Sequence, residues 1–360
     1  MSADRGESEV AALRALMAAH DLLPPVPDDP GDGERASRLL RRVLTTSTDR
    51  QHRPPVGWAA VLVLLLVVGS GYAFVASTPS ATASTPPSLR YSLASPVNLV
   101  EAASASEALA AIAAATEAAT TATHTADVQY VAQYGWLLAV DVDHTSTTVG
   151  VHPTLTRRWT APDGSARVDQ TRAPALDLDG RLSTDAPASV PGVSSDVAGP
   201  GTEDAALPQQ LPLDRAALRA TLLARYDALP CGQSAAWTTQ CLLTAVQDLY
   251  AQYVVPPELR ASLWLVLADD PGVKDLGSTE DRFGRPAHAV AVQTTDDPRS
   301  SGVVVLLISP TTGDLLGTEN ITLRDEQMGI TNPTVTAFTT FTTSTWVDAV
   351  GERPEGGDDD

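Results

Sequence analysis

The sequence predicts an α+β fold, in which a curved antiparallel sheet carries helices on one face and is preceded by one transmembrane helix and a short cytoplasmic segment. Three observations support this prediction. An uncharged run of 21 residues is long enough to cross a membrane, strand-like and helix-like segments follow it in separate blocks, and the strand-like segments have hairpin spacing. With 360 residues, 43% of them hydrophobic, the chain can bury one or two sizeable cores.

The apolar run covers residues 56–76. At 1.5 Å per residue it forms a helix of about 31 Å, close to the thickness of the hydrocarbon core of a bilayer. Trp58 lies near one end, and Tyr72 and Phe74 lie near the other, as aromatic side chains prefer at membrane interfaces. A buried helix of a soluble protein normally has a polar face, whereas this run has only Ser70 and three glycines. We therefore predict a single transmembrane helix.

Positive charge is concentrated before this span, which favours a cytoplasmic N-terminus and an extracytoplasmic C-terminal domain. Only Arg90 follows the span in the matching stretch, whereas five arginines precede it: Arg38, Arg41, Arg42, Arg50 and Arg53. Because 55 residues come before the run, we expect an uncleaved anchor in the cell membrane and not a signal peptide. Residues 81–83 (Ala-Thr-Ala) resemble a cleavage site, so removal of the anchor stays open as an alternative.

The cytoplasmic segment, residues 1–55, is expected to hold two short amphipathic helices, at 9–20 and 34–44, joined by a Pro/Gly-rich linker at 23–33. Helices this short are marginal alone, so the segment is either a partly disordered tail or a docking segment that folds on a partner. A sigma factor is the candidate partner, although the segment lacks the cysteines of many zinc-binding anti-sigma domains. If the segment docks on a partner, we expect the leucines of its apolar stripes to make the contact: Leu13, Leu16, Leu39 and Leu40.

Net charge is shared unevenly along the chain. The whole chain has a formal charge of −20, and nearly all of it falls after residue 55. This charge argues against nucleic acid as a partner, because a phosphate backbone is bound by clustered Lys and Arg and the chain shows no basic stripe. The acidic surface outside the membrane favours solubility and cationic partners.

After a Ser/Thr/Pro stalk at 77–88, the external domain is predicted over residues 89–350, followed by an acidic disordered tail at 351–360. Asn98 and Glu101 resemble a capping box that starts a helix ending near Thr121. Period-two patterns then predict three strands, at 128–141, 147–159 and 166–172, with a tight turn at Asp163-Gly164.

Residues 183–210 are expected to form a long surface loop, because they are rich in Ser, Pro, Gly and Asp. Three amphipathic helices follow, marked by stripes beginning at Leu218, Trp237 and Leu259. The final block predicts five strands, at 277–283, 287–295, 302–309, 315–323 and 335–347, with turns at 284–286 and 310–313.

Several of these motifs resemble an uncharacterised family of actinobacterial single-pass membrane proteins. They are Tyr130 with Trp136, Arg158-Trp159 ahead of the sequence DGSAR at 163–167, the turn DRFGR at 281–285, and ISPTTGDLL at 308–316. The resemblance implies no established activity, and implies only that some members are paired with sigma factors of the extracytoplasmic-function type. More distantly, the hairpin order is similar to the lipoprotein-carrier fold, an incurved sheet that holds acyl chains against helices.

Cys231 and Cys241 are the only cysteines, and both lie outside the membrane in the predicted topology. A disulfide between them closes a loop of about ten residues and stabilises the domain by roughly 2.7 kcal/mol in the chain-entropy model. Two buried thiols and a redox-active pair remain alternatives, although the Cys-x-x-Cys spacing of redox motifs is missing.

Metal binding is disfavoured. His144 and His152 lie close to Asp141 and Asp143, but the two histidines are about 26 Å apart on one continuous strand, so only an intervening hairpin could join them. The chain also lacks the common hydrolase, zinc-protease and phosphate-loop motifs. We therefore expect a protein that is not an enzyme and has no cofactor.

The sequence leaves two functions open. In the first, the external domain binds a ligand or envelope partner and the cytoplasmic segment regulates a sigma factor. In the alternative, the domain carries an envelope lipid or lipoprotein, which requires a cavity for a hydrophobic ligand between sheet and helices.

Overall fold

A computed structural model describes residues 88–118, 126–142, 147–176, 192–226, 229–294, 300–326 and 328–354. The predicted cytoplasmic segment, the apolar run 56–76 and nearly all of the stalk lie outside these residues. Within the described part, no helix is both long enough and apolar enough to cross a membrane.

The described domain is α+β, and its sheet contains nine antiparallel strands. The strands are β1 Val128–Val142, β2 Thr147–Thr160, β3 Ala166–Arg172, β4 Gly192–Ala198, β5 Lys274–Glu280, β6 Pro286–Gln293, β7 Ser300–Ile308, β8 Leu315–Asp325 and β9 Thr334–Val347. The helices are α4 Ser106–Ala118, α5 Leu207–Gln210, α6 Arg215–Ala224, α7 Ala235–Gln252 and α8 Pro257–Ala268.

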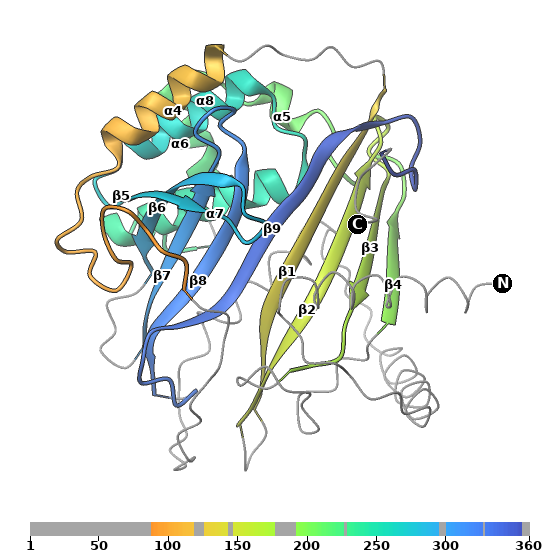
Figure 1. Cartoon of the computed structure of the whole chain (residues 1–360). Coiled ribbons are helices and arrows are strands. Elements are labelled where there is room, and N and C mark those ends of the chain that lie inside the picture. The colour runs from red at the N-terminus through yellow and green to blue at the C-terminus, as the bar shows by residue number, and fades with distance from the viewer. Residues whose placement is uncertain are drawn as a thin grey trace.

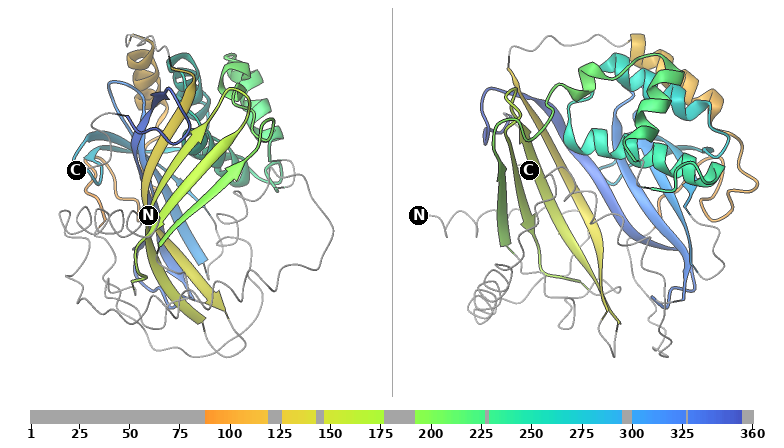
Figure 2. Two further views of the ribbon diagram at one scale, coloured as in Figure 1. Left: turned by 90° about the vertical axis from the view of Figure 1, so that its right-hand side faces the viewer. Right: turned by 180° about the vertical axis from the view of Figure 1, so that it is seen from behind.

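The strand order is β4-β3-β2-β1-β9-β8-β7-β6-β5, so the last strand of the chain lies in the middle of the sheet. Two hairpin blocks, β1–β4 and β5–β9, are joined by the ladder between β1 and β9, in which Val128 pairs with Val347. Figures 1 and 2 show the helices gathered on one face, over β5–β9, while β1–β4 extends beyond them. We call β5–β9 the covered wing and β1–β4 the open wing.

The eight strands predicted from the period-two patterns are confirmed, most of them within one or two residues, as are the three helices of the central block. The turn glycines Gly164, Gly284 and Gly313 have positive φ values, which favour glycine. Residues 351–354, assigned by sequence to the disordered tail, are described, and Trp159 Nε1 donates a hydrogen bond to the carbonyl oxygen of Glu352.

Two expectations were wrong. The first long helix begins at Ser106 and not near Asn98, because the backbone of residues 103–105 bonds to the β5 edge: Asp275 N donates to Ala103 O, and Ala105 N donates to Val273 O. The loop expected at 183–210 contains strand β4 and helix α5. Most of β4 is exposed and polar, so it carries no alternating apolar signal.

The sequence of each wing explains where the helices lie. On the helix-facing side of the covered wing, the strands present large apolar side chains such as Val290, Leu306 and Phe341, which pack against α7 and α8. Strand register places Gln133, Thr154 and Thr156 on the same side of the open wing. Polar side chains offer no hydrophobic gain to a covering helix, so the helical layer ends at this boundary.

The opposite face of the sheet has its own core, which includes Trp136 and Phe338. At this face Arg282, in the turn before β6, forms a buried ion pair with Glu319 of β8, with Nε 2.7 Å from Oε1. The Tyr91 hydroxyl donates to the other carboxylate oxygen, and the Arg282 guanidinium lies over the Phe338 ring. Through the hydrogen bond from Tyr91, Glu319 fixes the first described segment of the chain to the sheet.

Candidate functional site

The predicted disulfide between Cys231 and Cys241 is present in the structure, with the two Cα atoms 5.8 Å apart. Ser234 caps the N-terminus of α7 by accepting a hydrogen bond from Trp237 N, which fixes where the helix begins. The Thr238 hydroxyl, in the first turn, donates to Cys231 O at 2.6 Å. These contacts hold the loop before α7 against the helix, so that Cys231 reaches Cys241.

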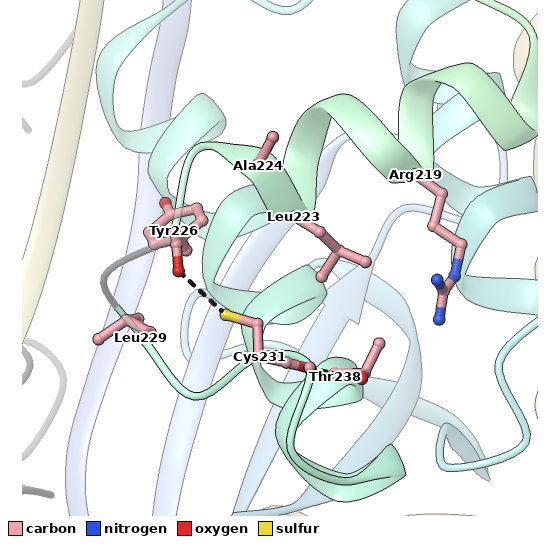
Figure 3. Close-up of a pocket in the computed structure, with 8 residues that line it drawn as sticks. Arg219, Leu223, Ala224, Tyr226, Leu229, Cys231 and Thr238 are labelled. Atoms are coloured by element: carbon pink, nitrogen blue, oxygen red, sulfur yellow. Dashed lines mark hydrogen bonds between the residues drawn. The ribbon is translucent and has the colours of Figure 1, made fainter.

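A surface hollow of about 460 Å³ lies beside this disulfide, between the C-terminal half of α6 and the loop that leads into α7 (Figure 3). Its lining combines apolar and polar side chains: Arg219, Leu223, Ala224, Tyr226, Leu229, Cys231, Gly232 and Thr238. Small-molecule sites are concave and combine apolar side chains with polar groups that orient the ligand. We treat this hollow as the candidate ligand site of the domain.

Tyr226, one of the residues that line the hollow, is bonded to the next helix. Its hydroxyl donates a hydrogen bond to the Asp248 carboxylate of α7. Burial is the main cause that raises the pKa of the Tyr226 hydroxyl, and the Asp248 charge adds to it. Burial also raises the pKa of Asp248, although the hydrogen bond from Tyr226 and the charge of Arg225 oppose it. The hydrogen bond therefore joins two buried groups whose pKa values are both raised.

Arg219 gives the hollow a positive charge. Its side chain is about two-fifths exposed, and its Nη2 lies 3.8 Å from the Asp270 carboxylate, a loose ion pair. Asp270 is engaged more tightly with the Thr239 hydroxyl at 2.7 Å and with Gly272 N. The arrangement can therefore bind an apolar group against Leu223 and direct an anionic or polar end of the ligand towards Arg219.

Breaking the disulfide is expected to destabilise the domain. We predict that Cys241→Ser lowers the free energy of unfolding by about 2–4 kcal/mol, because the unfolded chain regains the entropy of the open loop. Chemical denaturation of the oxidised protein and the variant measures this difference. Cys231→Ser is the matched control and should lower the free energy of unfolding by the same amount. Reduction of the unmodified protein should lower it to about the value of either variant. Equal stability of oxidised and reduced protein would contradict the prediction.

Of the two histidines considered for metal binding, only His152 lies in the described part of the chain. His152 lies on β2, and burial together with the Arg172 charge lowers its pKa to about 4, so it is neutral at physiological pH. His288 lies on β6, where its Nε2 is 2.8 Å from Asp275. His144 and His124 lie outside the described residues. In the described part of the chain, no three His, Cys, Asp or Glu side chains are grouped so that they could hold a metal ion.

The space between helices and sheet in the covered wing is filled by side chains. Trp264 of α8 is fully buried and stacks on Tyr250 of α7, with ring centroids 5.9 Å apart. Both rings donate hydrogen bonds to the carbonyl oxygen of Gly313, Trp264 at 2.8 Å and Tyr250 at 3.1 Å. This packing occupies the place where the lipid-carrier alternative requires a cavity, and so counts against that function.

The predicted docking residues Leu13, Leu16, Leu39 and Leu40 lie outside the described residues, so they stay predictions. The structure instead adds Arg219 and the Tyr226–Asp248 pair, which sequence reasoning did not single out as a site. In the sequence, Tyr226 belongs to the apolar stripe that begins at Leu218, so it is expected to be a core residue. No spacing rule connects it with Asp248 on the next helix.

Comparisons with known proteins are sparse. No family model and no curated protein matches this sequence. A similar chain is found in a solved structure described as "The complex structure of Pseudomonas aeruginosa MucA/MucB", at 15% sequence identity and a TM-score of 0.23. The alignment covers 68% of this chain and 57% of that chain, so this chain spans less than two thirds of the other. A likeness this distant carries no argument about function.

Proposed function

We propose that this chain is a single-pass membrane protein without enzymatic activity, whose external domain binds a ligand or envelope partner and whose cytoplasmic segment regulates a sigma factor. The observation that carries the external placement is the Cys231–Cys241 disulfide. Structural disulfides persist in oxidising compartments and are rare in the cytosol. The disulfide therefore supports the same orientation as the arginines before the apolar run.

The hollow beside the disulfide is the proposed place of ligand binding. It combines apolar surface with the partly exposed cation of Arg219. This combination suits recognition of a ligand that has an apolar part and an anionic or polar end.

The topology is tested with alkaline phosphatase fusions, which are active only outside the cytoplasm. We expect activity when the enzyme is fused after residue 354 and none when it is fused after residue 55. Both cysteines should also resist alkylation in protein isolated without reductant. The reverse pattern of phosphatase activity, or two alkylated cysteines, would overturn the proposed placement.

The regulatory part is tested by co-purification of the full-length protein from its own cells. We expect a sigma factor to be recovered with the unmodified chain and lost with the double variant Leu13→Asp and Leu40→Asp, because a buried aspartate disrupts an apolar helix interface. Ala15→Asp, which puts the same charge on the opposite side of the predicted helix, is the control and should keep the partner. Recovery of the same proteins with both variants would overturn the docking role.

A further inference from the structure

The segment that leads from the stalk into the domain exposes an unusual group of apolar side chains. Val100 is 91% exposed, Leu93 is 70% exposed and Val97 is 52% exposed. These three belong to the eight large hydrophobic side chains that are exposed in the described part of the chain, and they lie within eight consecutive residues. Single exposed apolar residues are normal at a protein surface, whereas a group of them marks a contact site. We call residues 93–100 the apolar loop.

The apolar loop is held in place by the domain. Leu93 N donates to Leu276 O at 3.0 Å and Ser92 N donates to Ser278 O at 3.1 Å, so the loop begins as a short addition to the β5 edge of the sheet. Leu99 is buried in the core of the sheet face opposite the helices. The exposed side chains therefore project from an anchored loop.

Charge along the sequence identifies what the loop faces. Residues 50–100 contain no aspartate or glutamate, although the whole chain has 44. This stretch holds the predicted span, the stalk and the apolar loop, and the acidic residues resume at Glu101. A segment that lies against anionic lipid headgroups avoids carboxylates, because like charges repel there, and Arg90 within it is attracted. The absence of acidic residues thus continues past the span into the folded domain and stops where the apolar loop stops.

Chain length keeps the loop close to the membrane. The stalk has 12 residues and extends at most about 40 Å, and the loop begins five residues after it. Only residues 88–92 of the folded domain are nearer to the span along the chain. Figure 1 shows this segment at the β5 side of the molecule, far from β4 at the other edge of the sheet.

We propose that the apolar loop inserts Leu93, Val97 and Val100 into the outer surface of the bilayer that holds the predicted span, so that the domain docks on the membrane with its β5 edge. This inference rests on the proposed anchoring of the chain. Aliphatic side chains gain about 25 cal/mol for each Å² that is removed from water, so three such side chains hold a domain that is already tethered nearby.

The test uses the full-length protein in nanodiscs of phosphatidylethanolamine and phosphatidylglycerol, with one copy in each disc. Because Cys231 and Cys241 are bonded to each other, Val100→Cys supplies a single free thiol for an environment-sensitive fluorophore such as NBD. We expect a blue shift of its emission, and quenching by lipids that carry a nitroxide near the headgroup. Val197→Cys on β4, where the native valine is 77% exposed, is the matched control and should show neither effect.

The outcomes separate the inference from the proposed function. Resistance of the chain to carbonate extraction tests the anchor independently of the loop. If the chain resists extraction and the label at position 100 behaves like the label at 197, the loop proposal is overturned while the anchor stands. If carbonate extracts the chain, both proposals fall. A blue shift that appears only in vesicles with several copies, and not in single-copy nanodiscs, would assign the loop to a contact between two chains and overturn the lipid contact.

Discussion

Replacing Arg282 by methionine is expected to destabilise the domain by about 3–5 kcal/mol, because it leaves the Glu319 carboxylate buried without its cation. Glu319 is fully buried, and the Arg282 side chain is only 8% exposed. The Tyr91 hydroxyl remains as a hydrogen-bond donor to Glu319, but a single neutral donor does not replace a guanidinium. Denaturant unfolding of the domain at neutral pH measures the loss.

The same substitution gives a pH dependence of defined sign. Burial raises the pKa of Glu319 above its ordinary value, and the Arg282 charge and hydrogen bond oppose this shift. A carboxyl with a raised pKa in the folded state favours folding when protonated, so its contribution is lost as the pH rises through the folded pKa. Without Arg282 the pKa rises further. The destabilisation should therefore be small near pH 4 and grow towards pH 8, by up to about 1.4 kcal/mol for each pH unit.

Matched variants isolate the ion pair. Glu319→Leu removes the carboxylate and leaves the Arg282 charge buried, so it should also destabilise the domain at neutral pH. The double variant Arg282→Met with Glu319→Leu buries no unpaired charge and should be more stable than either single variant. If the single losses simply add in the double variant, or if Arg282→Met has the same effect at low and high pH, the ion pair does not act as described.

Replacing Trp264 by alanine is expected to cost about 3–5 kcal/mol of unfolding free energy, the range for removing a buried large aromatic side chain. Trp264 has no exposed surface, stacks on Tyr250 and donates to Gly313 O. The substitution opens a cavity between α8 and the sheet that the surrounding backbone only partly closes. Differential scanning calorimetry or denaturant unfolding provides the measurement.

Trp264→Phe is an intermediate truncation. It keeps a six-membered aromatic ring and removes the five-membered part of the indole with its N–H, while Gly313 O still accepts from Tyr250. We expect a loss of about 1–2 kcal/mol, smaller than for alanine, because much of the aromatic packing remains and the carbonyl is not left unpaired. A loss for Trp264→Phe as large as for the alanine variant would contradict the packing argument.

The sequence predicted the strands that carry many apolar side chains. Strands β6 to β9 either alternate between apolar and polar side chains or are buried on both faces, and Gly or Pro marks their turns. Strand β4 was missed because its sequence, GVSSDVA, is exposed over most of its length and is fixed by pairing with β3. The start of α4 was misplaced because a local capping pattern near Asn98 competes with long-range bonds to the β5 edge, which sequence spacing does not reveal.

The candidate site was predictable only in part. Two cysteines ten residues apart, in a domain that the charge pattern predicts to be external, suggest a disulfide, and the structure contains it. The hollow beside it depends on how α6 packs against the loop before α7, and neither Arg219 nor the Tyr226–Asp248 pair belongs to a motif. The ion pair of Arg282 and Glu319 likewise joins the turn between β5 and β6 to strand β8. Such pairs are set by tertiary packing, and composition or periodicity carries no signal for them.

The central position of β9 has a consequence for biogenesis. A chain is synthesised from its N-terminus, so β1 and β8 emerge before the strand that lies between them. Until β9 has been synthesised, the two halves of the sheet each keep an unpaired edge at what becomes the centre of the domain. Completion of the domain is thus delayed to the end of synthesis. A chain that stops before residue 334 would leave both edges open to pairing with other chains.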